Sequence, residues 1–343
     1  MYPRVEINLE GILHNLHILR SKCEEQGSSL SLVTKVLGGR RQLVKYITEI
    51  SGITSICDSR VYNLAYFYEL DVEKWLIRSP MISEAETVVK YADVSLNSEL
   101  KVIEALNETA IKHNKKHKIV LMCECGDLRE GCYEEELLQI IEKCRTMDGI
   151  EIYGIGTNLS CLNEVLPSEE NMAEFVRLVE KAEECYGSEF RYISGGASSS
   201  IPMLFSGKLD KKINHLRFGE AVFLGNIPVY DKPFENAEIN NFILQAEVIE
   251  LKEKPASPEI PRDDCTNLRK RAIVAVGKQD IDIKGLSVLD ERIEIVAGSS
   301  DHVVLDVTNC GDEINVGSII SFRMNYNCLL NAMTSPYIKE HIV

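Results

Sequence analysis

The chain has 343 residues, which at roughly 150 residues per domain allows one large domain or two unequal ones with a sizeable core. Hydrophobic residues make up 45% and charged residues 27%, ordinary values that exclude a disordered or collagen-like chain. The formal net charge of −15 repels nucleic-acid phosphates and anionic membrane surfaces, so we expect neither as a partner. No apolar run reaches about 18 residues and the charged N-terminus is unlike a signal peptide, so we expect a cytoplasmic protein.

Short β-branched apolar runs alternate with longer amphipathic stretches between about residues 30 and 220. The strands are expected at 30–36, 53–57, 75–77, 94–96, 119–123, 152–156, 191–193 and 213–217. The helices between them include 60–70, 98–113, 134–144 and 169–185. A closed (β/α)8 TIM barrel requires about eight such units, whereas a doubly wound open sheet usually stops at about five or six. We therefore predict an α/β fold with a (β/α)8 barrel over residues 1–225.

The pattern changes after residue 225, where prolines become frequent and long helical stretches disappear. Strands are expected at 242–251, 271–276, 292–297, 302–307 and 318–324. Without crossover helices these strands must pair antiparallel, so we predict a C-terminal all-β domain over residues 226–343. The segment 253–268, rich in Pro, Asp and Glu, is interpreted as an exposed loop within that domain.

The 11 cysteines are scattered singly along the chain and contain no pair of Cys-x-x-Cys motifs, which indicates reduced thiols. Cys123, Cys125 and Cys132 form one cluster, and the first two share a face of a predicted strand. Three such sulfurs could bind a soft metal. Free cysteines more often pack as small hydrophobic residues, so we predict no metal site.

Lys35 ends the first predicted strand and is followed by the flexible pair Gly38-Gly39. The carboxyl ends of the strands form the active face of a (β/α)8 barrel, so this lysine is expected in the catalytic mouth. A lysine there either forms a Schiff base or holds a structural salt bridge, and its position alone favours neither.

Three further segments place polar groups at predicted strand ends. Residues 193–202 (Ile-Ser-Gly-Gly-Ala-Ser-Ser-Ser-Ile-Pro) offer N–H and hydroxyl donors suited to a phosphate, although a polar turn with a serine cap has the same composition. Residues 216–220 (Leu-Arg-Phe-Gly-Glu) supply a permanently charged guanidinium and a glycine that lets a ligand approach. Residues 126–131 (Gly-Asp-Leu-Arg-Glu-Gly) form a charged turn, which by itself is more often a solvated loop.

Together these segments resemble the ornithine racemases, which belong to the alanine-racemase-like, fold type III enzymes that depend on pyridoxal 5′-phosphate (PLP). The resemblance covers almost the whole chain. It rests on Thr-Lys-Val at 34–36, Asp-Ser-Arg at 58–60, Arg-Ser-Pro-Met at 78–81, Ser-Leu-Asn-Ser-Glu-Leu at 95–100, 126–131, Gly-Ile-Gly-Thr-Asn-Leu at 154–159, Ser-Gly-Gly at 194–196, Asn-His-Leu-Arg at 214–217, Gly-Lys-Gln-Asp at 277–280, Ser-Ser-Asp-His at 299–302 and Ala-Met-Thr-Ser-Pro-Tyr at 332–337.

The resemblance implies a PLP-binding barrel and a head-to-tail homodimer in which each β domain helps to close the partner's active site. Lys35 matches the lysine that carries the cofactor, and Arg217 matches the arginine that faces the pyridine nitrogen. The phosphate-binding positions of the family correspond to Ser198, Gly219 and Glu220.

Two more positions are implied by the same resemblance. Arg129 lies where alanine racemases have an arginine near the cofactor's phenolic oxygen and the substrate carboxylate, and Asn158 lies where they have a histidine near the ring. The implied reaction is removal and return of the Cα proton of an amino acid, with PLP as the electron sink. A guanidinium keeps the ring nitrogen unprotonated, because it does not readily give up a proton.

The chain departs from the family pattern at several positions. Lys278 occupies the place of the tyrosine that is the second base of alanine racemases, so we expect this lysine or another residue to be the second base. Ala197 stands where ornithine racemases are expected to have asparagine, and Val-Leu-Gly-Gly-Arg follows Lys35 in place of a Cys-Gly-Asp sequence. These departures weaken the identification of the substrate more than that of the cofactor.

The expected substrate is a basic amino acid such as ornithine or lysine. Its distal ammonium must meet carboxylates or carbonyls, since an unpaired buried charge is costly. The candidates are Asp127 and Glu130, which flank Arg129, and Asp280 and Asp301 in the two C-terminal motifs. Each of them could equally brace the fold. Other interpretations are a PLP-dependent enzyme of different reaction type, a non-catalytic PLP-binding protein of cofactor homeostasis, and a cofactor-free Schiff-base aldolase. The C-terminal β domain disfavours the homeostasis protein, and the phosphate-binding segment disfavours the aldolase.

Overall fold

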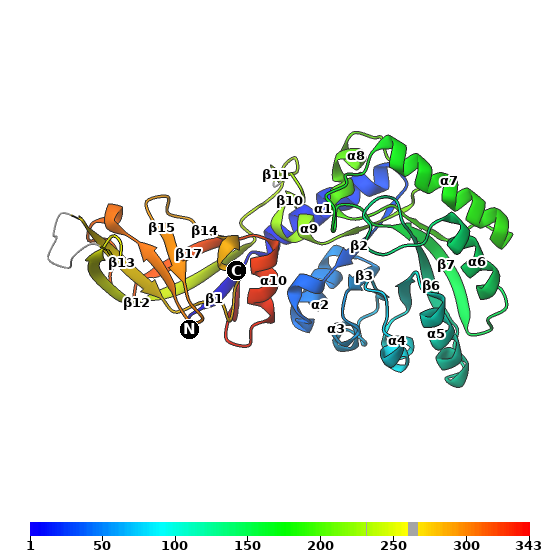
Figure 1. Ribbon diagram of the computed structural model, residues 1–343, viewed down its shortest axis with the longest axis horizontal. Coiled ribbons are helices and arrows are strands. Elements are labelled where there is room, and N and C mark those ends of the chain that lie inside the picture. Colours follow the sequence, from blue (N-terminus) through cyan, green and yellow to red (C-terminus); the bar gives the residue numbers. More distant parts are fainter. Residues whose placement is uncertain (231, 260–266) are drawn as a thin grey trace. The chain divides into compact units, whose positions relative to one another are not determined.

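The computed structural model describes residues 1–230, 232–259 and 267–343, and the chain forms two compact units (Figure 1). One unit comprises Leu13–Ala237. The other comprises Met1–Ile12 together with Glu238–Val343. Within the described residues, no helix is long and apolar enough to cross a membrane.

The unit Leu13–Ala237 is a closed barrel of eight parallel strands, which confirms the predicted (β/α)8 barrel (Figure 1). Its strands are β2 (Ser29–Val33), β3 (Ser55–Asp58), β4 (Glu73–Leu76), β5 (Val94–Asn97), β6 (His117–Cys123), β7 (Ile150–Thr157), β8 (Tyr192–Ser194) and β9 (His215–Phe218). The ring closes because β9 pairs with β2, Ser31 lying opposite Arg217.

Helices precede, connect and follow the strands of the barrel. They are α1 (Leu9–Glu25), α2 (Arg41–Ser51), α3 (Val61–Tyr66), α4 (Ala85–Tyr91), α5 (Leu100–Lys112), α6 (Glu134–Cys144), α7 (Glu169–Tyr186), α8 (Ile201–Phe205) and α9 (Glu220–Leu224), with the short 3-10 turns η1 (Lys35–Leu37), η2 (Ile82–Glu84) and η3 (Ser198–Ser200) and the hairpin of β10 (Asn226–Ile227) and β11 (Lys232–Pro233). The α7 boundaries follow directly from the sequence, since Ser168 and Asn171 form a capping box and Gly187 ends the helix.

Two expected elements end at least three residues earlier than the sequence pattern suggested. The strand expected at 30–36 ends at Val33, because Lys35 to Leu37 form the turn η1, whose end at Gly38 is left-handed with φ 56°. The helix expected at 60–70 ends at Tyr66, because the chain must reverse before β4 begins at Glu73.

The core of the barrel explains why its strands read as continuous apolar runs. Strands of a parallel barrel are buried on both faces, so alternation is lost. One cluster of buried residues joins strands β2 to β7 and consists of Val33, Cys57, Trp75, Val94, Leu96, Val120, Met122 and Tyr153.

The second unit is an eight-stranded sheet, which confirms the predicted C-terminal β domain (Figure 1). Its strands are β1 (Arg4–Ile7), β12 (Phe242–Pro255), β13 (Leu268–Val274), β14 (Leu286–Val288), β15 (Glu294–Gly298), β16 (Val303–Asp306), β17 (Ile319–Met324) and β18 (Lys339–Ile342). The order is β14-β17-β12-β13-β16-β15, with β1 beside β12 and β18 beside β1. All pairs are antiparallel except β1 with β18, which is parallel.

Three features of this unit were not anticipated. The N-terminal strand β1 adds to the C-terminal sheet, with Val5 and Ile7 buried, and the helix α10 (Tyr326–Thr334) follows β17. The strand β12 continues to Pro255 and pairs there with Leu268, so the expected loop 253–268 is confined to 256–267. Residues 260–266 of that loop lie outside the described residues.

Candidate active site

Lys35 lies at the carboxyl-terminal face of the barrel, as the sequence predicted, two residues beyond the end of β2. The side chain is half-buried on the turn η1. Thr34 is fully buried beside it, and its hydroxyl donates towards Oδ2 of Asp58 at 3.0 Å and the Cys57 carbonyl at 3.2 Å. The turn that presents Lys35 is therefore tied to the end of the neighbouring strand β3.

Arg217 is the central buried cation of the barrel. Its side chain points inward from β9 and is only 2% exposed. The guanidinium donates to the hydroxyl of Ser194, the side-chain oxygen of Asn158 and, at 2.8 Å, the carbonyl of Thr157. Burial lowers the pKa of Arg217 from its ordinary value, yet that value is so high that the group remains a cation.

A chain of hydrogen bonds extends from Arg217 across the barrel. Ser194 Oγ lies 2.8 Å from Nδ1 of His215, and Nε2 of the same ring lies 2.7 Å from Ser31 Oγ. The ring of His215 stacks on Trp75 with centroids 4.7 Å apart. Burial lowers the pKa of His215 to about 3, so this histidine is neutral.

The segments predicted to bind phosphate come together at one place. Ser198 opens η3, and its hydroxyl accepts a hydrogen bond from the Ala221 N–H at 3.3 Å, which joins the loop after β8 to the start of α9. Gly219 precedes α9, and a Cβ there would lie 3.0 Å from Val33 Cβ, so the start of α9 packs against the end of β2. Glu220 is the first residue of α9.

The charged turn 126–131 contributes a second connected group. Glu130 accepts hydrogen bonds from Arg129, with Nη2 at 2.6 Å, and from Asn158 Nδ2 at 2.7 Å. Because Asn158 also accepts a hydrogen bond from Arg217, a continuous chain of hydrogen bonds joins Arg129, Glu130, Asn158 and Arg217. Asp127 is only 2% exposed, and its Oδ1 accepts the N–H groups of residues 161–163 at 2.9 to 3.3 Å.

The cysteine cluster shows no arrangement for a metal. Cys123 and Cys132 are buried and face each other across an isolated bridge, and the Cys132 thiol donates to the Ser98 carbonyl at 3.2 Å. Over the ranges 1–230, 232–259 and 267–343, no group of three or more His, Cys, Asp or Glu side chains is placed to hold a metal ion.

The remaining candidates belong to the second unit. Lys278 donates its backbone N–H to Ser299 at 2.9 Å, which joins the two C-terminal motifs. Asp301 accepts from Gln279 at 2.7 Å, and Asp280 accepts from the hydroxyl of Ser335 at 2.5 Å. The structure thus brings the motifs 277–280, 299–302 and 332–337 together in this unit.

Several site residues had no role in the sequence analysis. Asp58 and His215 lay in motifs that carry the resemblance, and Ser194 lay in a candidate segment, yet none received a function. The signal that could have found them is the presence of polar residues at the ends of otherwise apolar strands, where each buried polar group needs a partner.

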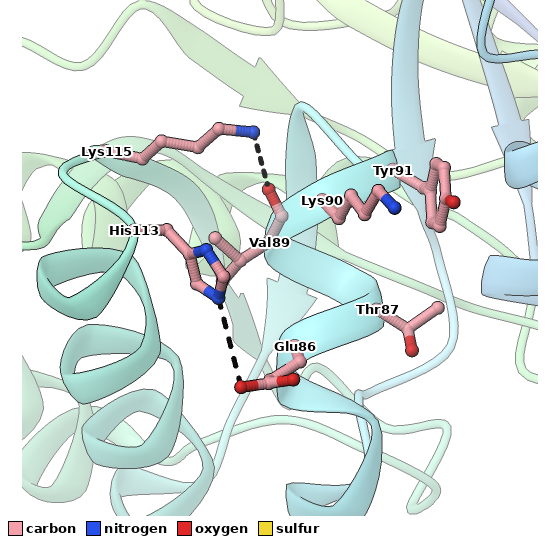
Figure 2. Close-up of a pocket in the computed structure, with 7 residues that line it drawn as sticks. All are labelled: Glu86, Thr87, Val89, Lys90, Tyr91, His113 and Lys115. Carbon is pink, nitrogen blue, oxygen red and sulfur yellow. Dashed lines mark hydrogen bonds and ion pairs between the residues drawn. The ribbon is translucent and has the colours of Figure 1, made fainter.

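A separate groove of about 530 Å³ runs along α4 (Figure 2). It is lined by Glu86, Thr87, Val89, Lys90, Tyr91, His113 and Lys115. Lys115 Nζ donates to the Val89 carbonyl at 3.4 Å. Tyr91 and Lys115 lie just before the amino-terminal ends of β5 and β6. The groove at these two residues is therefore at the opposite end of the barrel from Lys35.

Comparison with known proteins identifies the family. Residues 7–227 match the model of the alanine racemase N-terminal domain. The chain belongs to the alanine racemase family. An ornithine racemase from Acetoanaerobium sticklandii is 38% identical to this chain over 354 aligned residues, which cover 100% of both chains. A lysine racemase from Thermotoga maritima is 36% identical over 352 residues, covering 99% of this chain and 98% of the relative. The resemblance drawn from the sequence is thereby confirmed.

Solved structures of the alanine racemase family show the same fold. An alanine racemase from Bartonella henselae with covalently bound pyridoxal phosphate has a TM-score of 0.78 and 15% identity, over 100% of both chains. The residues of the present barrel fit such a group: a half-buried amine at Lys35, N–H and hydroxyl donors at Ser198 and the start of α9, and the buried guanidinium of Arg217. An amine can react with an aldehyde, N–H and hydroxyl groups can bind a phosphate, and a guanidinium can donate to a pyridine nitrogen.

Proposed function

We propose that the protein is a PLP-dependent amino-acid racemase that interconverts the enantiomers of a basic amino acid, ornithine or lysine. The observation that carries the proposal is the placement of Lys35, the Ser198 segment and Arg217 in one barrel, within a chain 38% identical over its full length to an ornithine racemase. The lysine racemase relative supports the same class of substrate.

In this proposal each group of the cofactor has a binding residue. Lys35 would hold the cofactor covalently, and the hydroxyl of Ser198 with the N–H groups of Gly219 and Glu220 would bind its phosphate. Arg217 would supply its guanidinium to the pyridine nitrogen and leave that nitrogen unprotonated, because a guanidinium does not readily give up a proton. When bound, PLP withdraws electrons from the amino-acid substrate and acidifies its Cα–H bond.

Racemisation requires a base on each face of the substrate. We assign one face to Lys35 and the other to Lys278 of a partner subunit, in a homodimer whose β domains complete the active sites. A lysine can serve as a base once its amine is neutral. Arg129 would bind the substrate carboxylate, with Glu130 and Asn158 fixing its direction.

The distal ammonium of the substrate needs an acidic partner. Asp280 and Asp301 are the leading candidates, because both occur in the motifs that surround Lys278. Asp127 and Glu130, which flank Arg129, are the other two candidates. The Oδ1 of Asp127 is already used by the backbone of residues 161–163, and Glu130 is paired with Arg129, which supports a structural role for both carboxylates.

The first prediction is that Lys35 carries PLP and is required for exchange of the Cα proton. Borohydride treatment of the purified protein should attach the cofactor to the peptide that contains Lys35. Incubation of single enantiomers in deuterated water should give the opposite enantiomer with deuterium at Cα, faster for ornithine or lysine than for alanine. Lys35→Ala should remove both signals, whereas Lys45→Ala, which changes an exposed lysine on α2, should retain both.

Other results would contradict the proposal in distinct ways. Covalent cofactor without Cα deuteration, but with a decarboxylated or eliminated product, would indicate a different PLP-dependent reaction. Bound PLP with no turnover of any amino acid would indicate a binding protein. Equal rates for alanine and ornithine would exclude recognition of the distal charge.

A further inference from the structure

Asp58 is a fully buried carboxylate with no role in the proposed mechanism. It is the last residue of β3, at the carboxyl-terminal end of the barrel. Its Oδ1 accepts the Arg60 N–H at 2.9 Å and the Asn63 side-chain amide at 3.1 Å, and its Oδ2 accepts from the Thr34 hydroxyl at 3.0 Å. Removing a carboxylate from water is costly, so a carboxylate kept in this place calls for a reason.

The hydrogen bonds of Asp58 lead to Lys35. Thr34 directly precedes Lys35, and its N–H donates to the Cys57 carbonyl at 2.7 Å while its hydroxyl reaches Asp58. The Gly38 N–H donates to the Lys35 carbonyl at 3.2 Å and closes the turn η1. The carboxylate therefore anchors the residue from which the Lys35 turn starts.

Lys35 is also the cation whose charge acts on this carboxylate. The charged and titratable groups on the neighbouring segments are Lys35 and Arg40 around η1, Cys57 on β3, Arg60, Tyr62 and Tyr66 around α3, Glu73 and Lys74 on β4, and Arg78 after β4. Of these, Lys35 acts on Asp58 through its charge. Burial raises the pKa of Asp58 to about 6, and the charge of Lys35 opposes that rise. Arg60 turns its backbone N–H to the carboxylate, and Arg78 is paired with Glu84 at 3.1 Å. Burial raises the pKa of Cys57 to about 12, so its thiol is neutral.

We propose that Asp58 is a positioning residue for Lys35, which anchors the turn η1 and supplies the negative charge that controls the protonation of the lysine nitrogen. The inference rests on the proposed function, in which Lys35 carries the cofactor and moves a proton. Ionised Asp58 favours a positive charge on that nitrogen, and protonated Asp58 releases it.

The surrounding bonds allow the charge and the anchoring to be separated. In Asp58→Asn the amide oxygen can still accept from Arg60 and Asn63, and the amide nitrogen can donate to Thr34 Oγ, whose proton turns to the Cys57 carbonyl. This change removes the charge and keeps the bonds. Thr34→Val does the reverse, because it removes the hydroxyl and keeps the carboxylate.

The second prediction concerns the holoenzyme, whose visible absorbance is titrated between about pH 4.5 and 8.5. The wild type should show a change with a midpoint near the Asp58 pKa of about 6. Asp58→Asn should lack this change. Thr34→Val should move the midpoint to higher pH, because the ionised carboxylate loses a hydrogen bond. The control Asp93→Asn alters a carboxylate at the amino-terminal end of β5 and should titrate like the wild type.

A measurement without cofactor supplies an independent readout. In the full-length protein freed of PLP, an amine-reactive reagent is applied at neutral pH and the Lys35 peptide is quantified by mass spectrometry. Asp58→Asn should label at Lys35 up to about tenfold faster than the wild type, since the loss of a neighbouring opposite charge changes protonation by about that factor. The labelling of Lys45 should be the same in both proteins.

The possible failures are distinguishable. If Lys35 carries the cofactor but Asp58→Asn titrates and labels like the wild type, the inference is overturned and the proposed function stands. If borohydride fixes the cofactor elsewhere, the proposed function fails, while the labelling rate still tests the charge of Asp58. If Asp58→Asn does not fold, an unchanged midpoint in Thr34→Val overturns the inference.

Discussion

Arg217 and His215 share one hydroxyl group, and this determines which nitrogen of the histidine carries the proton. Arginine can only donate, so Ser194 Oγ accepts from Arg217 and offers its own proton to Nδ1 of His215. The proton of the ring is then on Nε2, which donates to Ser31. A neutral ring in this place adds no positive charge beside Arg217. Through Ser194, the neutral ring of His215 orients the guanidinium of Arg217 without adding charge repulsion.

Three buried groups make opposing contributions to the pH dependence of stability. Burial lowers the pKa of His117 to about 4 and that of His215 to about 3, so in acid these two histidines bind protons in the unfolded chain and stay neutral in the folded one. The free energy of unfolding therefore decreases as the pH falls below about 6.5, the pKa of histidine in the unfolded chain. Asp58 acts in the opposite sense: its folded pKa of about 6 exceeds the unfolded value, so its penalty develops as the pH rises from about 4 to 6.

The third prediction follows from this balance. Near pH 5 the two histidines outweigh Asp58 by about one proton, so the free energy of unfolding should fall by about 1.4 kcal/mol per pH unit on acidification. Asp58→Asn removes the opposing group and should steepen the slope towards about two protons, while raising the stability at pH 7.5. Urea denaturation at several pH values measures both effects. A wild-type stability that is independent of pH between 4.5 and 6.5 would contradict the assigned pKa values.

At the scale of elements, the candidate site is built from the turns and loops that come directly after the barrel strands. Lys35 lies on a turn after β2, Asp58 ends β3, Arg129 and Asn158 follow β6 and β7, and the proposed phosphate donors follow β8 and β9. Parallel strands all end on one face of the barrel, so residues far apart in sequence collect there. The short helix α9 can start close to this face because Gly219 packs against Val33.

The fourth prediction concerns the contact between β7 and β8. A Cβ at Gly154 would lie 2.3 Å from the Tyr192 carbonyl oxygen, which belongs to the backbone and cannot move aside. Gly154→Ala should therefore cost about 1–3 kcal/mol in the free energy of unfolding, and more if the strands separate. Gly187→Ala is the matched control: no atom lies within 4 Å of a Cβ there, and the cost is only that of a left-handed helix end, about 1 kcal/mol. Equal losses in the two variants would show that the seam is not tight.

At the scale of the whole molecule, the proposal requires that two chains share each active site. Lys35 belongs to the barrel unit and Lys278 to the β-sheet unit. If the two lysines act together across a homodimer, neither Lys35→Ala nor Lys278→Ala should be active alone.

The fifth prediction is complementation between these two variants. After subunit exchange, half of the dimers should be hybrids, and each hybrid has one site with both lysines intact, so about a quarter of the wild-type activity should return. Subunit exchange is verified with differently tagged chains. A Lys278→Ala protein that is already active, or hybrids without activity, would count against a shared site and against Lys278 as the second base.

The sequence alone determined the barrel, the C-terminal sheet and the family. Strand and helix periods depend on residues next to each other in the chain, so the eight strands could be placed within a few residues, and the motifs around Lys35 and Arg217 were continuous segments. Only the tertiary structure decided which groups meet. The bond between Thr34 and Asp58, the contact of Glu130 with Asn158 and the pairing of β1 with β12 all join segments that are separate in sequence. Such contacts follow from the closure of the barrel and sheet, because the packing of whole elements, rather than local periodicity, brings their ends together.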